Sequence, residues 1–181
     1  MREKWNSRYR AKGDRRPKVP GYIKEQSDQW GAGKALDLGA GDGAASLFLA
    51  ANGWAVTAVD IADQGLKRLS LFAAEDGLEI STYCFDLDAK EWPDLGSFDL
   101  IVISHFKPEH SLWHRLPALL NKEGRLVLTS FNLEHHRNKG FSERFCLAPE
   151  EFAQCDGLQL VEYKSIIRDG DFMDDYCFQK L

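Results

Sequence analysis

The sequence predicts an α/β domain with a mostly parallel sheet, and three observations support this fold class. Short apolar runs alternate along the chain with segments that carry apolar residues at helical spacing. The run at 34–38 ends in a glycine cluster that opens directly into 44–51, the pattern of a strand, a tight turn and a helix. Two apolar stretches close the chain around Asp169-Gly170, which predicts a hairpin and therefore an antiparallel last strand.

The same patterns predict the elements in order. Strands are expected at 34–38, 55–60, 78–85, 97–105, 125–131, 158–168 and 172–181. Helices are expected at 44–51, at 62–77, over 112–120 with an interruption at Pro117, and from 148 to 155. The polar connection 132–147 is long for a compact domain, and such segments often form lids or binding loops.

We divide the chain into an N-terminal cap segment, 1–33, and a main domain, 34–181. The cap is basic and aromatic: residues 1–24 hold nine basic side chains and two acids, a charge of +7, so the remainder carries −12 of the total of −5. A basic segment can attract an anionic acceptor or nucleic acid. We favour a segment that folds back on its own acidic domain, since its aromatic residues need a surface to pack on.

Composition places the chain among ordinary globular proteins, with 44% hydrophobic and 28% charged residues. No apolar run approaches the roughly 20 residues that span a bilayer, and the first ten residues are too polar for a secretory signal. We therefore expect a cytoplasmic protein without a membrane partner, either a monomer or a homodimer. The four cysteines form no C-x-x-C pair, so no disulfide framework or zinc site is expected.

The glycine cluster Gly39-Ala40-Gly41-Asp42-Gly43 predicts a turn on which a nucleotide-like ligand can lie. Gly39 and Gly41 let the backbone bend and keep side chains away from the ligand, while Gly43 lets the helix pack tightly on the strand. Gly39, Gly41 and Ala44 also satisfy the dinucleotide pattern G-x-G-x-x-G/A, and Asp60 follows about 20 residues later.

Two classes of ligand bind on such a turn, dinucleotides and S-adenosylmethionine. Asp37, two residues before the first glycine, helps to distinguish between them. Its carboxylate would repel a pyrophosphate but suits the positive amino and sulfonium groups of S-adenosylmethionine. The stretch 36–43, LDLGAGDG, resembles the first motif of class I S-adenosylmethionine-dependent methyltransferases at every position. Trp5-Asn-Ser-Arg-Tyr9 is similar to the W-x-x-R-Y segment of small bacterial members, the tellurite-resistance and thiopurine methyltransferase branch.

This resemblance covers about 5–181, with its specific motifs between 34 and 105. It implies a Rossmann-like fold in which a seven-stranded, mostly parallel sheet has the order 3-2-1-4-5-7-6, an antiparallel last strand and helices on both faces. It also implies S-adenosylmethionine as cofactor and S-adenosylhomocysteine as product.

The contacts that the resemblance implies come from the cap segment and from successive strand ends. Asp37 and the glycine turn would hold the methionine part, and Asp60 at the end of the second strand would hold the ribose. Asp86 would face the adenine amino group, with Ile61 and Leu87 against the ring. The candidate cofactor ligands are Arg8, Tyr9, Asp37, Gly39, Ala40, Gly41, Asp60, Ile61, Asp86, Leu87 and Ser104. A structural cap for Arg8 and Tyr9, an N-cap for Asp60 and an ordinary loop acid for Asp86 are the alternatives.

The fourth strand would deliver Ser104 and His105 beside the transferred methyl group, as in the family. His105 is the candidate general base because imidazole titrates near neutrality, although it can equally be a packing residue. The segment Ser104-His-Phe-Lys107 lacks the Asn/Asp-Pro-Pro-Tyr/Phe motif of enzymes that methylate base or glutamine amines. His110 and His114 are four residues apart, but no third ligand follows at a recognisable spacing, so no metal site is predicted.

The sequence therefore predicts a methyltransferase for a small-molecule acceptor. Two alternatives stay open: a non-catalytic S-adenosylmethionine-binding module and an NAD-dependent oxidoreductase. The acceptor, the need for a general base and the oligomeric state cannot be read from the residues.

Overall fold

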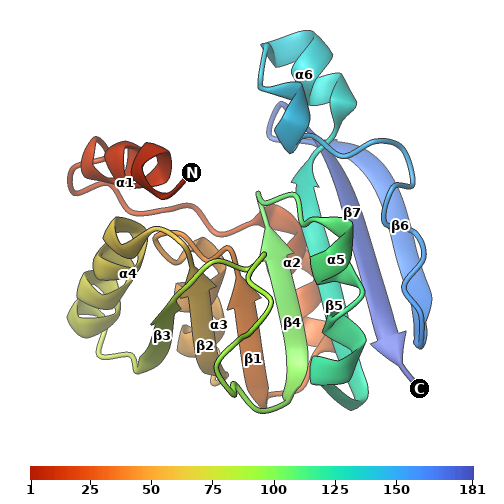
Figure 1. Ribbon diagram of the computed structural model, residues 1–181, viewed down its shortest axis with the longest axis horizontal. Coiled ribbons are helices and arrows are strands. Elements are labelled where there is room, and N and C mark those ends of the chain that lie inside the picture. Colours follow the sequence, from red (N-terminus) through yellow and green to blue (C-terminus); the bar gives the residue numbers. More distant parts are fainter. The chain divides into compact units, whose positions relative to one another are not determined.

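The computed structural model describes all residues, 1–181. They form two compact units, Met1–Leu95 and Gly96–Leu181. Seven strands follow the order β3-β2-β1-β4-β5-β7-β6 (Figure 1). β7 runs antiparallel to both of its neighbours, β5 and β6. The predicted fold class and strand order are confirmed, whereas the predicted boundary after residue 33 stays a prediction.

The first unit contains three parallel strands, β1 (Lys34–Leu38), β2 (Ala55–Asp60) and β3 (Ile80–Cys84). The helices α3 (Ala44–Ala51) and α4 (Asp63–Glu75) connect them and pack on β1, β2 and β3. Four of the five β1 residues are buried, because both faces of the strand are covered. Side chains from the turn, β2 and α4 form one part of the core: Ala40, Ala58, Leu66 and Leu69, with Ile80 packed against them.

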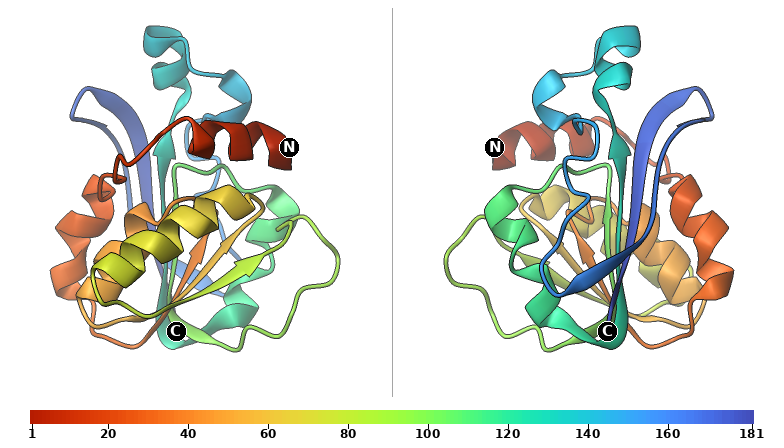
Figure 2. Two further views of the ribbon diagram at one scale, coloured as in Figure 1. Left: turned by 90° about the vertical axis from the view of Figure 1, so that its left-hand side faces the viewer. Right: turned by 90° about the vertical axis from the view of Figure 1, so that its right-hand side faces the viewer.

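The N-terminal segment forms α1 (Arg2–Arg10), α2 (Gly21–Gln26) and the 3₁₀ helix η1 (Ser27–Gln29). α1 lies across α4 (Figure 2). Buried Asn6 joins the two helices, because its Nδ2 donates to Asp63 Oδ1 at 2.8 Å and its Oδ1 accepts the backbone N–H of Gln64 at 3.1 Å. Asn6 thereby satisfies one of the free N–H groups at the start of α4.

Ion pairs hold the basic residues after α1 against the same helix. Arg16 pairs with Glu75 and Asp76 at 2.7 Å each, and Arg68 of α4 donates to the carbonyl oxygens of Gly13 and Arg15. The prediction that this segment folds back on its own acidic domain is confirmed.

The second unit contains β4 (Phe98–Ser104), β5 (Leu120–Phe131), β6 (Leu158–Arg168) and β7 (Asp171–Lys180). Its helical segments are α5 (His110–Trp113), α6 (Leu133–Lys139) and the 3₁₀ helices η2 (Leu116–Leu119) and η3 (Glu143–Phe145). α6 begins where β5 ends (Figure 1). Within the core of this unit the Trp113 ring packs on Phe152 and Phe178, with ring centroids 4.9 and 5.7 Å away.

Three predictions for this unit are wrong in detail. The segment 148–155 forms turns instead of a helix, since Glu150 adopts a left-handed φ of 55° and Glu151 folds back to accept the N–H of Ala148. β5 begins at Leu120, five residues early, with an irregular register beside β4. The 132–147 connection contains a helix, because the Asn132 side chain caps α6 at the N–H groups of Glu134 and His135.

The interruption expected in the helix over 112–120 is observed. Pro117 lies inside a 3₁₀ turn that follows the single turn of α5, because proline cannot donate an intrahelical hydrogen bond. None of the helices is both long enough and apolar enough to cross a lipid bilayer.

The Asn6 contacts predict a stability effect of Asn6→Ala. Both hydrogen bonds to the start of α4 are lost and Asp63 Oδ1 loses this donor, so the free energy of unfolding should fall by about 1–2 kcal/mol. Urea denaturation followed by circular dichroism measures the change. Asn138→Ala is the control, because this exposed residue bonds only to Glu134 of its own helix, α6, and should change stability by less than about 0.5 kcal/mol. Equal losses in the two variants would contradict the role of Asn6.

Candidate functional site

The backbone N–H groups of the glycine turn are already used within the protein. Gly39 and Ala40 both donate to Val59 O, at 2.9 and 3.0 Å, and Gly43 donates to Ala40 O at 3.0 Å. Gly41 donates to Asp60 Oδ2 at 2.8 Å. The turn is therefore fixed to the end of β2, and these four donors do not face an empty anion site.

Asp37 lies on β1 and is almost completely buried, with 1% of its surface exposed. Its Oδ2 accepts the hydroxyl of Ser46 on α3 at 2.7 Å, whereas its Oδ1 is buried without any hydrogen-bond partner. Burial raises the pKa of Asp37 to about 7. The hydrogen bond from Ser46 lowers this pKa and the nearby charge of Asp60 raises it, but burial is the largest effect. A buried acceptor without a donor is costly, so this atom marks a place for a donating ligand group.

Asp60 ends β2 and also lies mostly buried, with 8% exposed. Its two oxygens accept the N–H groups of Gly41 and Ala62, at 2.8 and 2.7 Å. Burial raises the pKa of Asp60 in spite of these hydrogen bonds. Asp60 thus holds the glycine turn and the chain that leads into α4, and each oxygen keeps a second lone pair for a ligand.

Tyr9 reaches from α1 to the glycine turn. Its hydroxyl and ring fill the space that a side chain at Gly41 would need, and its ring edge lies 3.0 Å from where a Cβ of Gly65 would stand. Burial raises the pKa of Tyr9, and the charges of Asp60, Asp42 and Asp37 raise it further, so the phenol stays neutral. The sequence predicted open space for a ligand at Gly41, but the structure places Tyr9 there.

Arg8 points elsewhere. It is exposed, and its guanidinium group packs over the Trp5 ring at 5.1 Å. Tyr9 and Asp60 therefore come together in the first unit, and Arg8 does not join them. Gly43 also differs from expectation, because the close contact that a Cβ would make there is with Leu69 of α4 and not with a strand.

Asp42 was missed by the sequence analysis. It is 4% exposed, and its Oδ2 pairs with Lys12 at 2.5 Å and with Arg68 at 3.3 Å. Because Arg68 also holds the backbone of 13–15, this one carboxylate ties the glycine turn to the N-terminal segment. Its position as the only charged residue among the glycines is the signal that could have indicated it.

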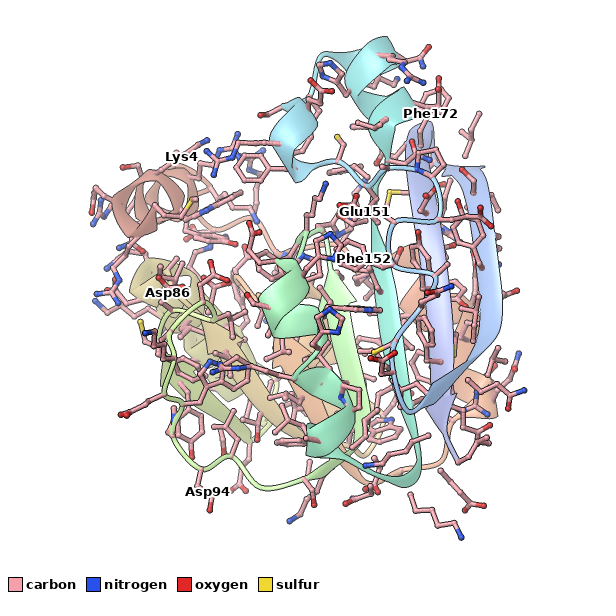
Figure 3. All side chains as sticks on the ribbon, turned by 45° about the vertical axis from the view of Figure 1, so that its right-hand side comes forward. Lys4, Asp86, Asp94, Glu151, Phe152 and Phe172 are labelled. Atoms are coloured by element: carbon pink, nitrogen blue, oxygen red, sulfur yellow. The ribbon has the colours of Figure 1, made fainter.

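The adenine candidates follow β2 and β3. Half-buried Ile61 accepts a hydrogen bond from Arg2 Nε at its carbonyl oxygen, and Leu87 is 7% exposed. Asp86 is exposed, two residues beyond the end of β3, and its Oδ1 accepts the N–H of Asp88 at 2.9 Å (Figure 3). No hydrogen bond joins Asp86 to Asp37 or Asp60, although all three acids belong to the first unit.

Ser104 and His105 lie in the second unit, at the end of β4. Ser104 is buried, whereas His105 is exposed and adopts a left-handed φ of 52° while its N–H donates to Thr129 O at 2.9 Å. Neighbouring groups remove water from the ring, and this desolvation lowers the pKa of His105. The charge of Asp171 acts in the opposite direction. A lowered pKa favours the neutral imidazole, which is the form that can accept a proton.

Comparisons with known proteins agree with this geometry. A family model described as a methyltransferase domain matches residues 35–130. A ubiquinone biosynthesis O-methyltransferase of Idiomarina loihiensis is 28% identical over 116 residues, 62% of this chain and 48% of that protein. The chain spans about half the length of the curated relatives it matches.

Two solved structures have the same fold. TehB from Haemophilus influenzae superimposes with a TM-score of 0.72 and 19% identity, covering 90% of this chain and 63% of that chain. A protein that was solved in work on the conversion of a disulfide bond into a thioacetal group during echinomycin biosynthesis gives a TM-score of 0.74 and 16% identity, covering 99% and 93%.

The position of Tyr9 predicts an unusually large effect of Gly41→Ala. Gly41 and Gly53 both have positive φ, 56° and 91°, but only the Cβ added at Gly41 meets another residue. Gly41→Ala should therefore destabilise the protein by about 1–3 kcal/mol more than Gly53→Ala in urea denaturation. Combining Gly41→Ala with Tyr9→Phe should recover part of this loss, since the nearest atom is the Tyr9 hydroxyl. Equal losses at the two glycines would refute the placement of Tyr9.

Proposed function

The chain belongs to the methyltransferase domain family, and we propose that it binds S-adenosylmethionine and methylates a small-molecule acceptor. The single observation that carries the proposal is the buried Asp37 Oδ1 without a hydrogen-bond partner. The amino group of the methionine part is a cationic donor, and an ion pair with Asp37 would satisfy that oxygen. The residues present therefore fit this cofactor.

The use of the turn N–H groups argues against a dinucleotide. A pyrophosphate on a glycine turn needs free backbone donors at the helix start. Here Gly39, Ala40 and Gly41 donate to Val59 O and Asp60 instead. Two buried carboxyl groups beside the turn, Asp37 and Asp60, would in addition repel a phosphate.

We assign the remaining cofactor contacts by residue. Asp60 would accept the ribose hydroxyls with its second lone pairs while it continues to hold Gly41. Ile61 and Leu87 would lie against the adenine ring, and Asp86 would accept from its amino group. Tyr9 would cover the glycine turn and exclude water, which strengthens every charged contact in the site.

When bound, S-adenosylmethionine supplies a methyl group on a positively charged sulfur, which is activated for direct transfer. The residues of this chain then need to align the acceptor and exclude water, effects worth roughly 7–11 kcal/mol. His105 would take a proton from an acceptor hydroxyl, because its lowered pKa favours the neutral imidazole and its ring nitrogens make no hydrogen bond within the protein. Ser104 lies one residue before it, at the end of the same strand.

Calorimetry with S-adenosylhomocysteine tests the binding site. Asp60→Ala removes the proposed ribose acceptor, and we expect about 10- to 100-fold weaker binding. Asp60→Asn keeps the shape of the side chain. If Asp60→Ala also weakens binding by disturbing the turn, Asp60→Asn should lose less affinity than Asp60→Ala. Asp28→Ala, at an exposed acid in η1, is the control and should bind as the wild type does. Unchanged affinity in Asp60→Ala would refute the ribose assignment.

The raised pKa of Asp37 predicts that binding depends on pH. In the free protein the carboxyl is half protonated near pH 7. A bound amino group favours the carboxylate and lowers this pKa, so affinity should rise with pH and level off above 7. Below pH 7 each unit should cost up to about tenfold in affinity, and binding should release close to one proton.

Asp37→Asn provides the control for this dependence. Asparagine keeps an acceptor for Ser46 but has no charge, so affinity should fall and the proton release below pH 7 should shrink. The neighbouring titratable groups are Asp60 and Tyr9, and both remain in the variant. A wild-type affinity that stays flat from pH 6 to 8 would contradict the ion pair.

A further inference from the structure

A cluster of five neighbouring rings lies at the ends of β4 and β5 and in the segment that follows β5. Phe131 is its centre: its ring lies 4.1 Å from His135 in a stacked arrangement, 5.0 Å from His105 edge to face, and 4.9 Å from Phe141. Phe145 extends the row, 6.4 Å from Phe141. We call these residues the aromatic cluster: His105, Phe131, His135, Phe141 and Phe145.

The cluster is not closed off like the core of the second unit. Phe131, Phe141 and Phe145 are only half-buried and His105 is exposed, whereas the core rings of Trp113, Phe152 and Phe178 are almost fully buried. Aromatic rings that remain partly exposed next to one another can receive a further ring by stacking or edge contacts.

One hydrogen bond fixes the orientation of His135, and charged groups lie at both ends of the row. His135 is buried, and its Nδ1 accepts the N–H of Phe172 at 3.3 Å. A neutral His135 therefore carries its proton on Nε2. Phe172 lies near the start of β7 (Figure 3). Asp171 Oδ1 lies 3.9 Å from the same Nδ1. At the other end of the row, the guanidinium group of Arg144 lies 4.9 Å over the Phe145 ring.

His105 differs from His135 because neither of its ring nitrogens has a hydrogen-bond partner, and its one ring contact is with Phe131. Its backbone is also held in the left-handed region at φ 52°, which few non-glycine residues adopt, although histidine, asparagine and aspartate do so more often than the others. An uncommon backbone that presents an unpaired imidazole beside a stacked ring is the arrangement expected of a residue that acts on a ligand.

We propose that the aromatic cluster binds a planar aromatic acceptor that carries an ionisable hydroxyl group, with the ring stacked at Phe131 and Phe141 and the hydroxyl directed to His105. The hydroxyl proton passes to the free imidazole nitrogen, and the oxygen keeps the electron pair that forms the new bond to the methyl group. The bond between that methyl group and the cofactor sulfur breaks, and its electron pair stays on the sulfur of the S-adenosylhomocysteine product. This inference rests on the proposed function and names the acceptor class for it.

Other acceptor classes fit the cluster less well. A saturated polyol cannot stack on the rings, and an aliphatic chain has no proton to give to the unpaired imidazole of His105. An anionic substituent on the aromatic ring would find Arg144 at the edge of the cluster.

Saturation-transfer NMR with the full chain tests the inference, using catechol as the probe and cyclohexane-1,2-diol as its saturated counterpart. We expect catechol to bind at least threefold more tightly than the saturated diol. Phe131→Leu and, separately, Phe141→Leu should weaken catechol binding by about three- to tenfold, because each removes one stacking partner.

Phe48→Leu is the matched control, since Phe48 is a half-buried phenylalanine on α3 in the first unit. It should leave catechol binding unchanged. Equal binding of the two probes, or losses at Phe131 and Phe141 no larger than at Phe48, would overturn the proposal. Self-association of the wild type that Phe131→Leu abolishes would also overturn it, because a second copy would then occupy the cluster.

His105→Asn separates binding from proton transfer. Asparagine tolerates a positive φ, so the backbone can stay in place. In the methyl-transfer assay with catechol, kcat should fall by about 10²-fold or more with little change in KM. An unchanged kcat would remove His105 from the proposal.

S-Adenosylhomocysteine binding is measured on the same samples. If it fails while catechol binds as described, the proposed function is wrong and the aromatic site stands. If S-adenosylhomocysteine binds and catechol does not, only the acceptor class is wrong.

Discussion

The carboxyl group of Asp37 is the constraint on which the rest of the site depends. A strand residue that is 1% exposed carries an ionisable group with one oxygen bonded to Ser46 and the other to nothing. Such an oxygen costs free energy in the folded protein unless a ligand supplies a donor. The raised pKa expresses the same cost, because the protein partly avoids it by keeping the proton. In our account, ligand binding offsets a penalty that the free protein carries.

The surroundings of Asp37 are arranged to keep that position intact. Asp60 fixes the glycine turn through Gly41 N–H, and Tyr9 closes the turn from α1. α1 is held in turn by Asn6 at the start of α4, and the following segment by Arg68. The N-terminal segment therefore helps to hold the glycine turn and α4 in place, although it lies outside the matched family domain, which begins at residue 35.

Much of this could be predicted from the sequence, because strand and helix periodicity and the glycine turn are local signals. They located the seven strands, and since parallel strands end at one edge, they indicated that Asp37 and Asp60 would be neighbours. The cap of α4 by Asn6 and the Lys12–Asp42–Arg68 contacts could not be predicted, because they join side chains distant in sequence. The helix expected from 148 fails because Glu150 adopts a positive φ, which no propensity signals for glutamate.

The central claim can be tested at the carboxyl group itself. Carbon-13 NMR titration of Asp37, assigned by its absence from Asp37→Asn, measures the pKa in the free protein and with S-adenosylhomocysteine bound. We predict a value near 7 in the free protein and a fall of at least one unit in the complex, since the amino group of the ligand stabilises the carboxylate. An ordinary pKa in the free protein, or one that the ligand leaves unchanged, would contradict the account.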